Sequence, residues 1–243
     1  MENYKKRLYD SYVSSGQVGK KETLNPELLF APSRTYIQGV INRYFKNEDK
    51  QKKIVDIGCG HGTFIYFLQK YNFVNLYGFD ISKEQIDLGH KLGISNIEHK
   101  SIEQFLSESF ENIDIFLLID LLEHLTHEEI FNLLDKLYSK LNKGGKILIH
   151  IPNAEGIFGM RIRYGDLTHE LAFTPQSIHQ LLSTIGFSQI ACHEDKPSIH
   201  GLKSLVRRIL WEVLTLFFRL LLIAETGTLH FVLSQNMTVI ASK

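Results

Sequence analysis

The sequence predicts an α/β fold, a doubly wound and mostly parallel sheet of seven strands with helices on both faces. Three observations predict it. Apolar, β-branched runs alternate with helical patterns, and the first of these runs leads through a glycine turn directly into a helix. A further run at 113–119 is apolar enough to be buried on both faces, as the central strands of parallel sheets are.

The first half of the chain supplies the elements up to this central strand. Residues 1–50 are expected to form a helical cap or lid, because apolar residues recur at helical spacing before a polar break. The core is expected to begin with a strand at Ile54. The elements that follow are a strand at 76–80, a helix with Ser82 as its N-cap, a short strand at 96–99 and the strand at 113–119.

The second half continues the alternation. The expected elements are a helix over 128–141 stopped by a turn at 142–145, a strand over 146–151, a helix from Pro175 to 185, a strand over 187–192 and a last strand or hairpin half over 231–242. The core is therefore expected to comprise 51–200 and 228–243, with 201–227 as a helical insertion before the last strand.

The segment 202–223 within this insertion is mostly apolar, and its polar residues recur every three or four positions as one narrow stripe of a helix. Charges in its middle argue against a membrane span. Two main alternatives stay open. The helix packs on its own domain or on a partner subunit, as in a homodimer, or it lies in a membrane interface with Arg207, Arg208 and Arg219 towards the lipid head groups.

Composition limits the partners and the compartment. The formal net charge is zero, which gives no electrostatic basis for nucleic-acid binding. The two cysteines lie far apart without metal-ligand spacing, and the charged amino-terminal stretch lacks the apolar core of a secretion signal. We therefore expect a cytoplasmic protein, with peripheral contact to the inner face of the membrane as an open alternative.

The most specific motif is Asp56-x-Gly58-x-Gly60-x-Gly62, between the first strand and the helix after it. Glycines let the backbone turn tightly and approach a ligand, and the start of a helix offers free N–H groups. A dinucleotide fingerprint would require glycine or alanine where this chain has Thr63. The next strand ends at Asp80, whose carboxylate can accept a bond from each of two ribose hydroxyls.

These residues, with Leu-Glu-His-Leu at 122–125 and Lys-Gly-Gly-Lys at 143–146, resemble the class I S-adenosylmethionine (SAM) methyltransferases over roughly 50–195. The resemblance implies a Rossmann-like fold and methyl transfer from SAM, with S-adenosylhomocysteine as product. It implies that the turn cradles the amino-acid part of SAM and that Asp80 holds the ribose, although such a carboxylate suits NAD as well. The cofactor contacts expected on this basis are Tyr12, Asp56, Gly58, Cys59, Gly60, Asp80, Ile81, Ser101, Ile102 and Asp120.

Two of these expected contacts have a particular place in the family pattern. Ser101 stands where many members carry an acidic residue that binds the adenine amino group. Tyr12, with Tyr9 and Ser14, resembles the lid segments that close over SAM, and packing of an aromatic helix face on the core is an equal alternative.

The richest polar cluster follows the fifth strand, where the loops of parallel sheets bind substrates. Gly-Asp-Leu-Thr-His-Glu at 165–170, followed by Phe-Thr-Pro at 173–175, resembles methyltransferases of cell-surface glycan pathways, many of which modify sugar hydroxyls. The resemblance implies O-methylation of a sugar on a nucleotide-linked or surface-glycan precursor in polysaccharide biosynthesis. Arginines could hold a phosphate group of such a precursor. The expected substrate-binding residues are Asn153, Arg161, Arg163 and Tyr164.

His169 is the expected general base, because an unperturbed imidazole accepts protons near neutral pH. Asp166 would orient His169 or share the proton, and His124 is expected to line the same pocket. The alternative is that Asp166 caps a turn and His169 makes a structural hydrogen bond. No metal is expected, because the histidines and glutamates at 123–129 only partly share a helix face.

Three other functions stay open. One is O-methylation of a membrane-soluble acceptor of the quinone or polyprenol type, suggested by 202–223. A second is a non-catalytic SAM-binding scaffold whose long helix mediates assembly. The third is a nicotinamide-dependent reductase, although the only Tyr-x-x-x-Lys match, Tyr66 to Lys70, lies on the first core helix instead of after the fourth strand.

Overall fold

The predicted strands form one seven-stranded sheet in the order β3-β2-β1-β4-β5-β7-β6. The structure, a computed structural model, describes residues 3–10 and 24–243. All strands run parallel except β7, which lies antiparallel between β5 and β6. Their bounds are β1 Ile54–Ile57, β2 Leu76–Asp80, β3 Ile97–His99, β4 Ile113–Ile119, β5 Leu141–Pro152, β6 Ser188–Glu194 and β7 Asn236–Ser242.

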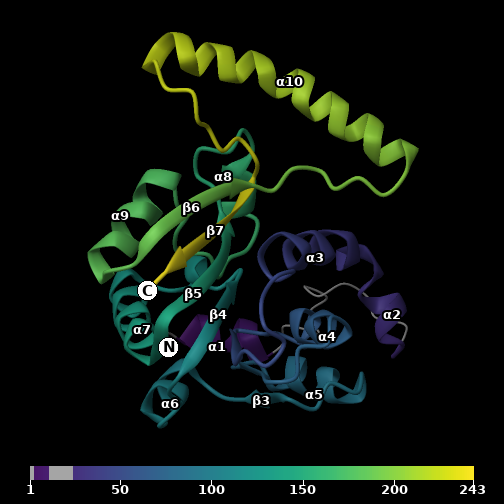
Figure 1. Cartoon of the computed structure of the whole chain (residues 1–243), viewed down its shortest axis with the longest axis vertical. Helices are drawn as coiled ribbons and strands as arrows, with labels where there is room; N and C mark the ends of the chain where they lie inside the picture. The colour runs from purple at the N-terminus through teal and green to yellow at the C-terminus, as the bar shows by residue number, and fades with distance from the viewer. Residues whose placement is uncertain (1–2, 11–23) are drawn as a thin grey trace.

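Helices cover both faces of this sheet, as the alternation predicted (Figure 1). One face carries α3 Ala31–Tyr44, α4 Thr63–Lys70 and α5 Lys83–Lys91. The other face carries α6 Ile102–Ser107, α7 His127–Lys140 and α9 Pro175–Ile185. The other described elements are α1 Asn3–Asp10, α2 Pro26–Leu29, the 3-10 turn η1 Leu122–His124, α8 Gly159–Arg163 and α10 Leu202–Thr226.

The central strand β4 has no solvent face, because successive side chains enter two different hydrophobic cores. Phe116 and Leu118 belong to the core on the α7 side, whereas Leu117 belongs to the core on the α4 side. The apolar run at 113–119 therefore forms the buried strand that was predicted, and its carboxyl end delivers the next residues to the edge of the sheet.

Two strand boundaries differ from the prediction by five residues. The fifth strand begins at Leu141 instead of 146, because Gly144 adopts a φ of 75° and lets the predicted turn continue the strand with an irregular register beside Ile113. The last strand begins at Asn236 instead of 231. The five residues before it form a loop that places Val232 in the core.

Helix α10 carries the predicted polar stripe, but the stripe faces the protein. Its Ser204 and Thr215 are buried, and Arg219 Nη2 lies 2.6 Å from Glu194 Oε1. Glu212 pairs with Lys196 at 3.0 Å. Arg219 and Arg208 thus bind the rest of the chain, which favours the alternative of packing on the protein's own domain over the one in which they point to lipid head groups.

The opposite side of α10 is apolar and faces solvent, and the helix lies apart from the two layers of the fold (Figure 1). Within the described residues, no helix combines the length and apolarity needed to cross a membrane. The exposed apolar residues on this side are Leu202, Val206, Ile209, Leu210, Val213, Leu214, Leu216, Phe217, Leu220 and Leu221.

Candidate active site

Three glycines shape the turn between β1 and α4. Gly58, Gly60 and Gly62 have φ values of 73°, 57° and 84°, a left-handed conformation that favours glycine. The backbone N–H groups of Gly58 and Cys59 both donate to the carbonyl oxygen of Phe79, which ties the turn to β2. A Cβ atom on Gly58 would lie 3.0 Å from the Leu121 side chain. The conformation at this position therefore favours glycine, and any side chain there would also have to displace Leu121.

The Asp80 carboxylate, at the end of β2, is fixed by this turn. Its Oδ2 accepts the N–H of Gly60 at 2.8 Å, and its Oδ1 accepts the N–H of Ser82 at 2.7 Å. Each oxygen has a further lone pair, so the carboxylate can still accept bonds from two hydroxyls. Asp80 lines a cavity of about 300 Å³ whose wall also includes Gly58, Gly60, Ile81, Ile102 and Asp120.

Asp56 lies beneath the turn with 2% of its surface exposed. Burial and the charge of Asp80 raise the pKa of Asp56 to about 8. Its Oδ1 has no hydrogen-bond partner among the described residues, which is costly for a buried polar atom. Asp56 lines a second cavity, of about 310 Å³, with Gly58 and Asp120. A cationic donor such as the amino group of SAM would satisfy this oxygen, so these residues fit the expected cofactor.

Four of the remaining predicted cofactor contacts line the two cavities, and one does not. Cys59, Ile81, Ile102 and Asp120 are part of their walls. Burial raises the pKa of the Cys59 thiol well above its usual range, so the thiol stays neutral. The Ser101 hydroxyl accepts the N–H of Gln104 at 3.2 Å as the N-cap of α6. The prediction of an adenine contact from the Ser101 side chain is therefore replaced by a capping role.

The amino-terminal lid is described only in part, since Tyr12 and Ser14 lie outside the described residues. In α1, Lys5 and Tyr9 line the 300 Å³ cavity. The Ser82 hydroxyl, predicted to cap α5, instead donates to the carbonyl oxygen of Tyr9. Helix α1 therefore covers the cavity, as a lid segment would.

Asp120 follows β4 in a left-handed conformation, with φ 51°, and is held by His150 on β5. The Nδ1 of His150 lies 2.5 Å from Asp120 Oδ1, and its Nε2 lies 2.6 Å from Asp195 Oδ2. Burial opposes a charge on this ring, but the two carboxylates outweigh it and raise the pKa of His150 well above its usual range. A buried imidazolium therefore positions Asp120 where the two cavities meet.

Replacement of His150 by glutamine is expected to lower the free energy of unfolding by about 3 kcal/mol, because Asp195 loses its buried counter-charge. Since the folded pKa is raised, this stabilisation is complete below the ordinary value of 6.5 and is lost as the pH rises through the folded value. Denaturant unfolding between pH 6 and 9 measures the effect, with the exposed His179→Gln as control. A loss that grows with rising pH, or equals that of the control, contradicts the assignment.

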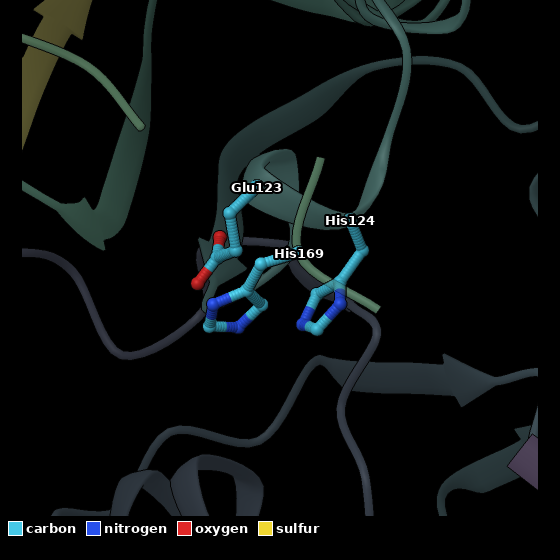
Figure 2. Close-up of side chains that lie close together, drawn as sticks. All are labelled: Glu123, His124 and His169. Atoms are coloured by element: carbon cyan, nitrogen blue, oxygen red, sulfur yellow. The ribbon is translucent and has the colours of Figure 1, made fainter. Parts of the chain in front are cut away.

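Glu123, His124 and His169 meet beside the carboxyl end of β4 (Figure 2). Glu123 and His124 belong to η1, and His169 comes from the loop between α8 and α9. One ring nitrogen of each histidine and one carboxylate oxygen all lie within 4.8 Å of one another. The structure thus brings two of the predicted catalytic residues together, with His124 also lining the 300 Å³ cavity.

Hydrogen bonds determine which nitrogen of each ring carries a proton. His169 Nδ1 lies 3.0 Å from the carbonyl oxygen of Ile162, which can only accept, so this nitrogen donates. The Thr168 hydroxyl donates to Asp166 and therefore accepts from His124 Nδ1 at 2.8 Å. Burial, helped by neighbouring His169, lowers the pKa of His124 to about 4. In the neutral form both rings keep an Nε2 lone pair, and Asp166 orients His124 through the Thr168 hydroxyl.

The predicted substrate-binding residues do not share one surface. The Asn153 side chain is fully buried and donates to the carbonyl oxygens of Val232 and Ser234, so it anchors the loop before β7. Arg163 donates to the carbonyl oxygens of His169 and Glu170 and holds their loop. Arg161 and Tyr164 are exposed. Asn153 and Arg163 thus have structural bonds in place of the predicted acceptor contacts.

A larger cavity, of about 1270 Å³, lies beneath α10 and not at the glycine turn. Arg43, Glu194 and Arg219 are among the residues that line it. It contains no backbone N–H from the turn and neither Asp56 nor Asp80. Size alone therefore does not identify the candidate site, and the two smaller cavities have the chemistry that the sequence predicted.

Two residues of this site had no assigned role in the sequence prediction. His150 is a histidine inside the otherwise apolar run 147–151, and a polar residue in a buried strand is a signal that could have indicated it. Lys5 carries no comparable signal. Its Nζ reaches the carbonyl oxygen of His124 at 2.9 Å only because α1 folds back over the sheet edge.

A family model described as a methyltransferase domain matches residues 31–191. A tRNA U34 carboxymethyltransferase from Campylobacter jejuni is 25% identical over 180 residues, which are 72% of this chain and 54% of that protein. The chain thus spans about half the length of this relative. A SAM-dependent methyltransferase structure from Archaeoglobus fulgidus gives a TM-score of 0.64 at 23% identity, with all of both chains covered.

A second solved structure has a bound cofactor. It is a magnesium protoporphyrin IX methyltransferase with SAM from Synechocystis PCC 6803, with a TM-score of 0.58 at 13% identity. The similarity covers 99% of this chain and 95% of that one. At such identities these structural likenesses establish the fold alone.

Proposed function

The chain belongs to the methyltransferase-domain family, and from this premise we propose that it is an enzyme that transfers the methyl group of SAM to a hydroxyl oxygen. The glycine turn with its two carboxylates carries the proposal. Asp80 offers two fixed oxygens to a ribose, and Asp56 offers an unpaired buried oxygen to an amino group. Neither arrangement is needed to hold the sheet together, which disfavours a purely structural scaffold.

The proposed acceptor group is a hydroxyl of a sugar on a nucleotide-linked or surface-glycan precursor. The loop that supplies His169 is the one whose sequence resembles glycan methyltransferases. Bound SAM supplies the methyl group, which forms a C–O bond as the C–S bond breaks and its electron pair returns to sulfur. His169 Nε2 accepts the hydroxyl proton, and Asp120 borders the methionine end of the cofactor.

An acceptor held at a membrane, of the quinone or polyprenol type, is the second candidate. The exposed apolar side of α10 favours it, since such a surface suits a lipid interface. A tRNA acceptor, as the name of the Campylobacter jejuni relative states for that protein, is not favoured here. The formal net charge of zero provides no excess of cations for a polyphosphate backbone.

Methyl-labelled SAM and the purified chain test this function. Acceptors are nucleotide sugars and lysate glycans in one arm, and liposomes containing quinones or polyprenols in the other. Mass spectrometry is expected to find the label on a sugar hydroxyl. Label confined to the liposome arm supports the membrane acceptor instead, and label on RNA or protein alone refutes both. Absence of heat on titration of SAM refutes the cofactor assignment itself.

A further inference from the structure

The cluster of Glu123, His124 and His169 contains three electron-pair donors that lie within 4.8 Å of one another (Figure 2). Both imidazoles keep their Nε2 lone pairs because each Nδ1 donates elsewhere. Glu123 is 1% exposed, and its Oε2 has no hydrogen-bond partner among the described residues. A cation bound between this buried carboxylate oxygen and the two nitrogen lone pairs beside it would provide a partner for all three.

We propose that Glu123, His124 and His169 bind a divalent transition-metal ion next to the SAM cavity. Two imidazoles and one carboxylate are a ligand set of catalytic zinc sites and of iron sites with open positions. Mg²⁺ and Ca²⁺ prefer oxygen ligands alone, so the two nitrogens select Mn²⁺, Fe²⁺, Co²⁺, Ni²⁺ or Zn²⁺. The sequence disfavoured a metal because the histidines and glutamates at 123–129 only partly share a helix face, whereas the third ligand comes from another loop.

The backbone holds the three ligands in place before any ion binds. The N–H groups of Glu170 and Leu171 both donate to the carbonyl oxygen of Glu123, at 2.7 and 3.1 Å. Arg163 binds the carbonyl oxygen of His169, which fixes the same loop from its other side. Lys5 binds the carbonyl oxygen of His124. Ligands that are held by such contacts lose little freedom on binding an ion.

The Nδ1 hydrogen bonds of both histidines resemble those of metal-bound histidines. Such a histidine donates its second N–H to a carbonyl oxygen or to a group that is itself bonded to a carboxylate. His169 donates to a main-chain carbonyl oxygen. His124 donates to Thr168, whose hydroxyl lies 2.6 Å from Asp166. The predicted catalytic residue Asp166 thereby becomes a positioning residue for His124.

An ion at this point would have open positions, since three protein ligands do not fill a coordination shell. An acceptor hydroxyl bound there would lose its proton more readily, to water, because the ion would then occupy the His169 lone pair; this role in methyl transfer rests on the proposed function. Ion binding does not rest on it. The negative charge of Asp120, which acts on both histidines, adds to the attraction for a cation.

Titration of the chelator-stripped full chain with Co²⁺ tests the site by calorimetry and by visible absorption of the bound ion. One equivalent is expected to bind to the wild type. His169→Ala and Glu123→Gln are each expected to weaken binding by about 100-fold or more, since loss of even an outer-shell partner costs 10- to 100-fold. The exposed His127→Ala, next to the same turn, is expected to leave the affinity unchanged within twofold.

SAM titration of the same samples keeps the outcomes separate. Variants that bind SAM like the wild type are folded, so their loss of Co²⁺ supports the site. A wild type that binds SAM but not Co²⁺ overturns the metal site and leaves the proposed function standing. A wild type that binds Co²⁺ but not SAM supports the metal site and overturns the proposed function. Equal Co²⁺ affinity in all four proteins, or binding of Mg²⁺ in place of Co²⁺, overturns the assignment.

Discussion

Alanine at position 169 is expected to lower kcat by about 100-fold or more while the affinity for SAM stays within about twofold of the wild type. Proton transfer by a positioned side chain contributes about 10² to 10⁴ to a rate. The Nε2 lone pair of His169 either accepts the hydroxyl proton or binds a metal ion, and alanine removes it in both cases. Single-turnover rates with labelled SAM, and calorimetry for SAM itself, measure the two quantities.

His127→Ala is the matched control for this experiment, because it removes an exposed imidazole near the same turn and leaves Glu123 and His124 intact. Its rate is expected to equal that of the wild type. Turnover of the His169→Ala protein within about threefold of the wild type, with SAM still bound, would remove His169 from the mechanism. The pH dependence of kcat gives a second reading, since loss of a base flattens its acidic limb.

Asparagine in place of Asp80 is expected to weaken SAM binding by about 100-fold or more. Hydrogen bonds to a charged acceptor contribute about 1.5–3 kcal/mol each, and the ribose offers two. The amide also fails on the protein side, because its NH₂ group would face the N–H of either Gly60 or Ser82. Isothermal calorimetry with SAM and with S-adenosylhomocysteine measures the loss.

Asp87→Asn serves as the control for Asp80→Asn. Asp87 lies on the neighbouring helix α5 and pairs with Lys83 at the surface, so the change removes the same charge without touching the cavity. SAM affinity is expected to be unchanged in this protein. If Asp80→Asn binds SAM within threefold of the wild type, the carboxylate does not hold the ribose, and the cofactor requires another location.

Most of the fold was predictable because its signals are local. The runs at 76–80 and 113–119 form strands with the predicted ends, since each is apolar and bounded by residues that break a strand. The predicted ends failed where the outcome depends on a neighbouring strand. Leu141 pairs with Ile113, and no local pattern contains that pairing.

The cofactor half of the site was predictable for the same reason, since the glycine turn and Asp80 are strand-end features. The acceptor half was predicted only in part. His124 and His169 were identified, but Glu123 becomes a partner of His169 only when two distant segments meet. Asn153 and Arg163 were misleading, because a polar side chain in a loop bonds the chain as readily as it bonds a ligand.

The orientation of α10 illustrates a similar limit. Periodicity predicted the helix and its polar stripe, but a stripe with charges is normally turned to solvent. Here Arg219 and Glu212 find partners on the segment 194–196, which comprises the last residue of β6 and the two residues after it, so the stripe turns inwards. The spacing of residues within one helix does not predict where partner residues from other segments will lie.

That segment consists of three consecutive residues with three different attachments. Glu194 binds Arg219 and Lys196 binds Glu212, both on α10, while Asp195 between them binds the ring of His150. Through Asp195 and His150, the helix is thus linked to Asp120, which lines both cavities of the candidate site. Suppose that a partner bound to the exposed side of α10 and an acceptor bound at the site favour the same arrangement of these contacts. Each ligand then raises the affinity of the other, and the two factors are equal.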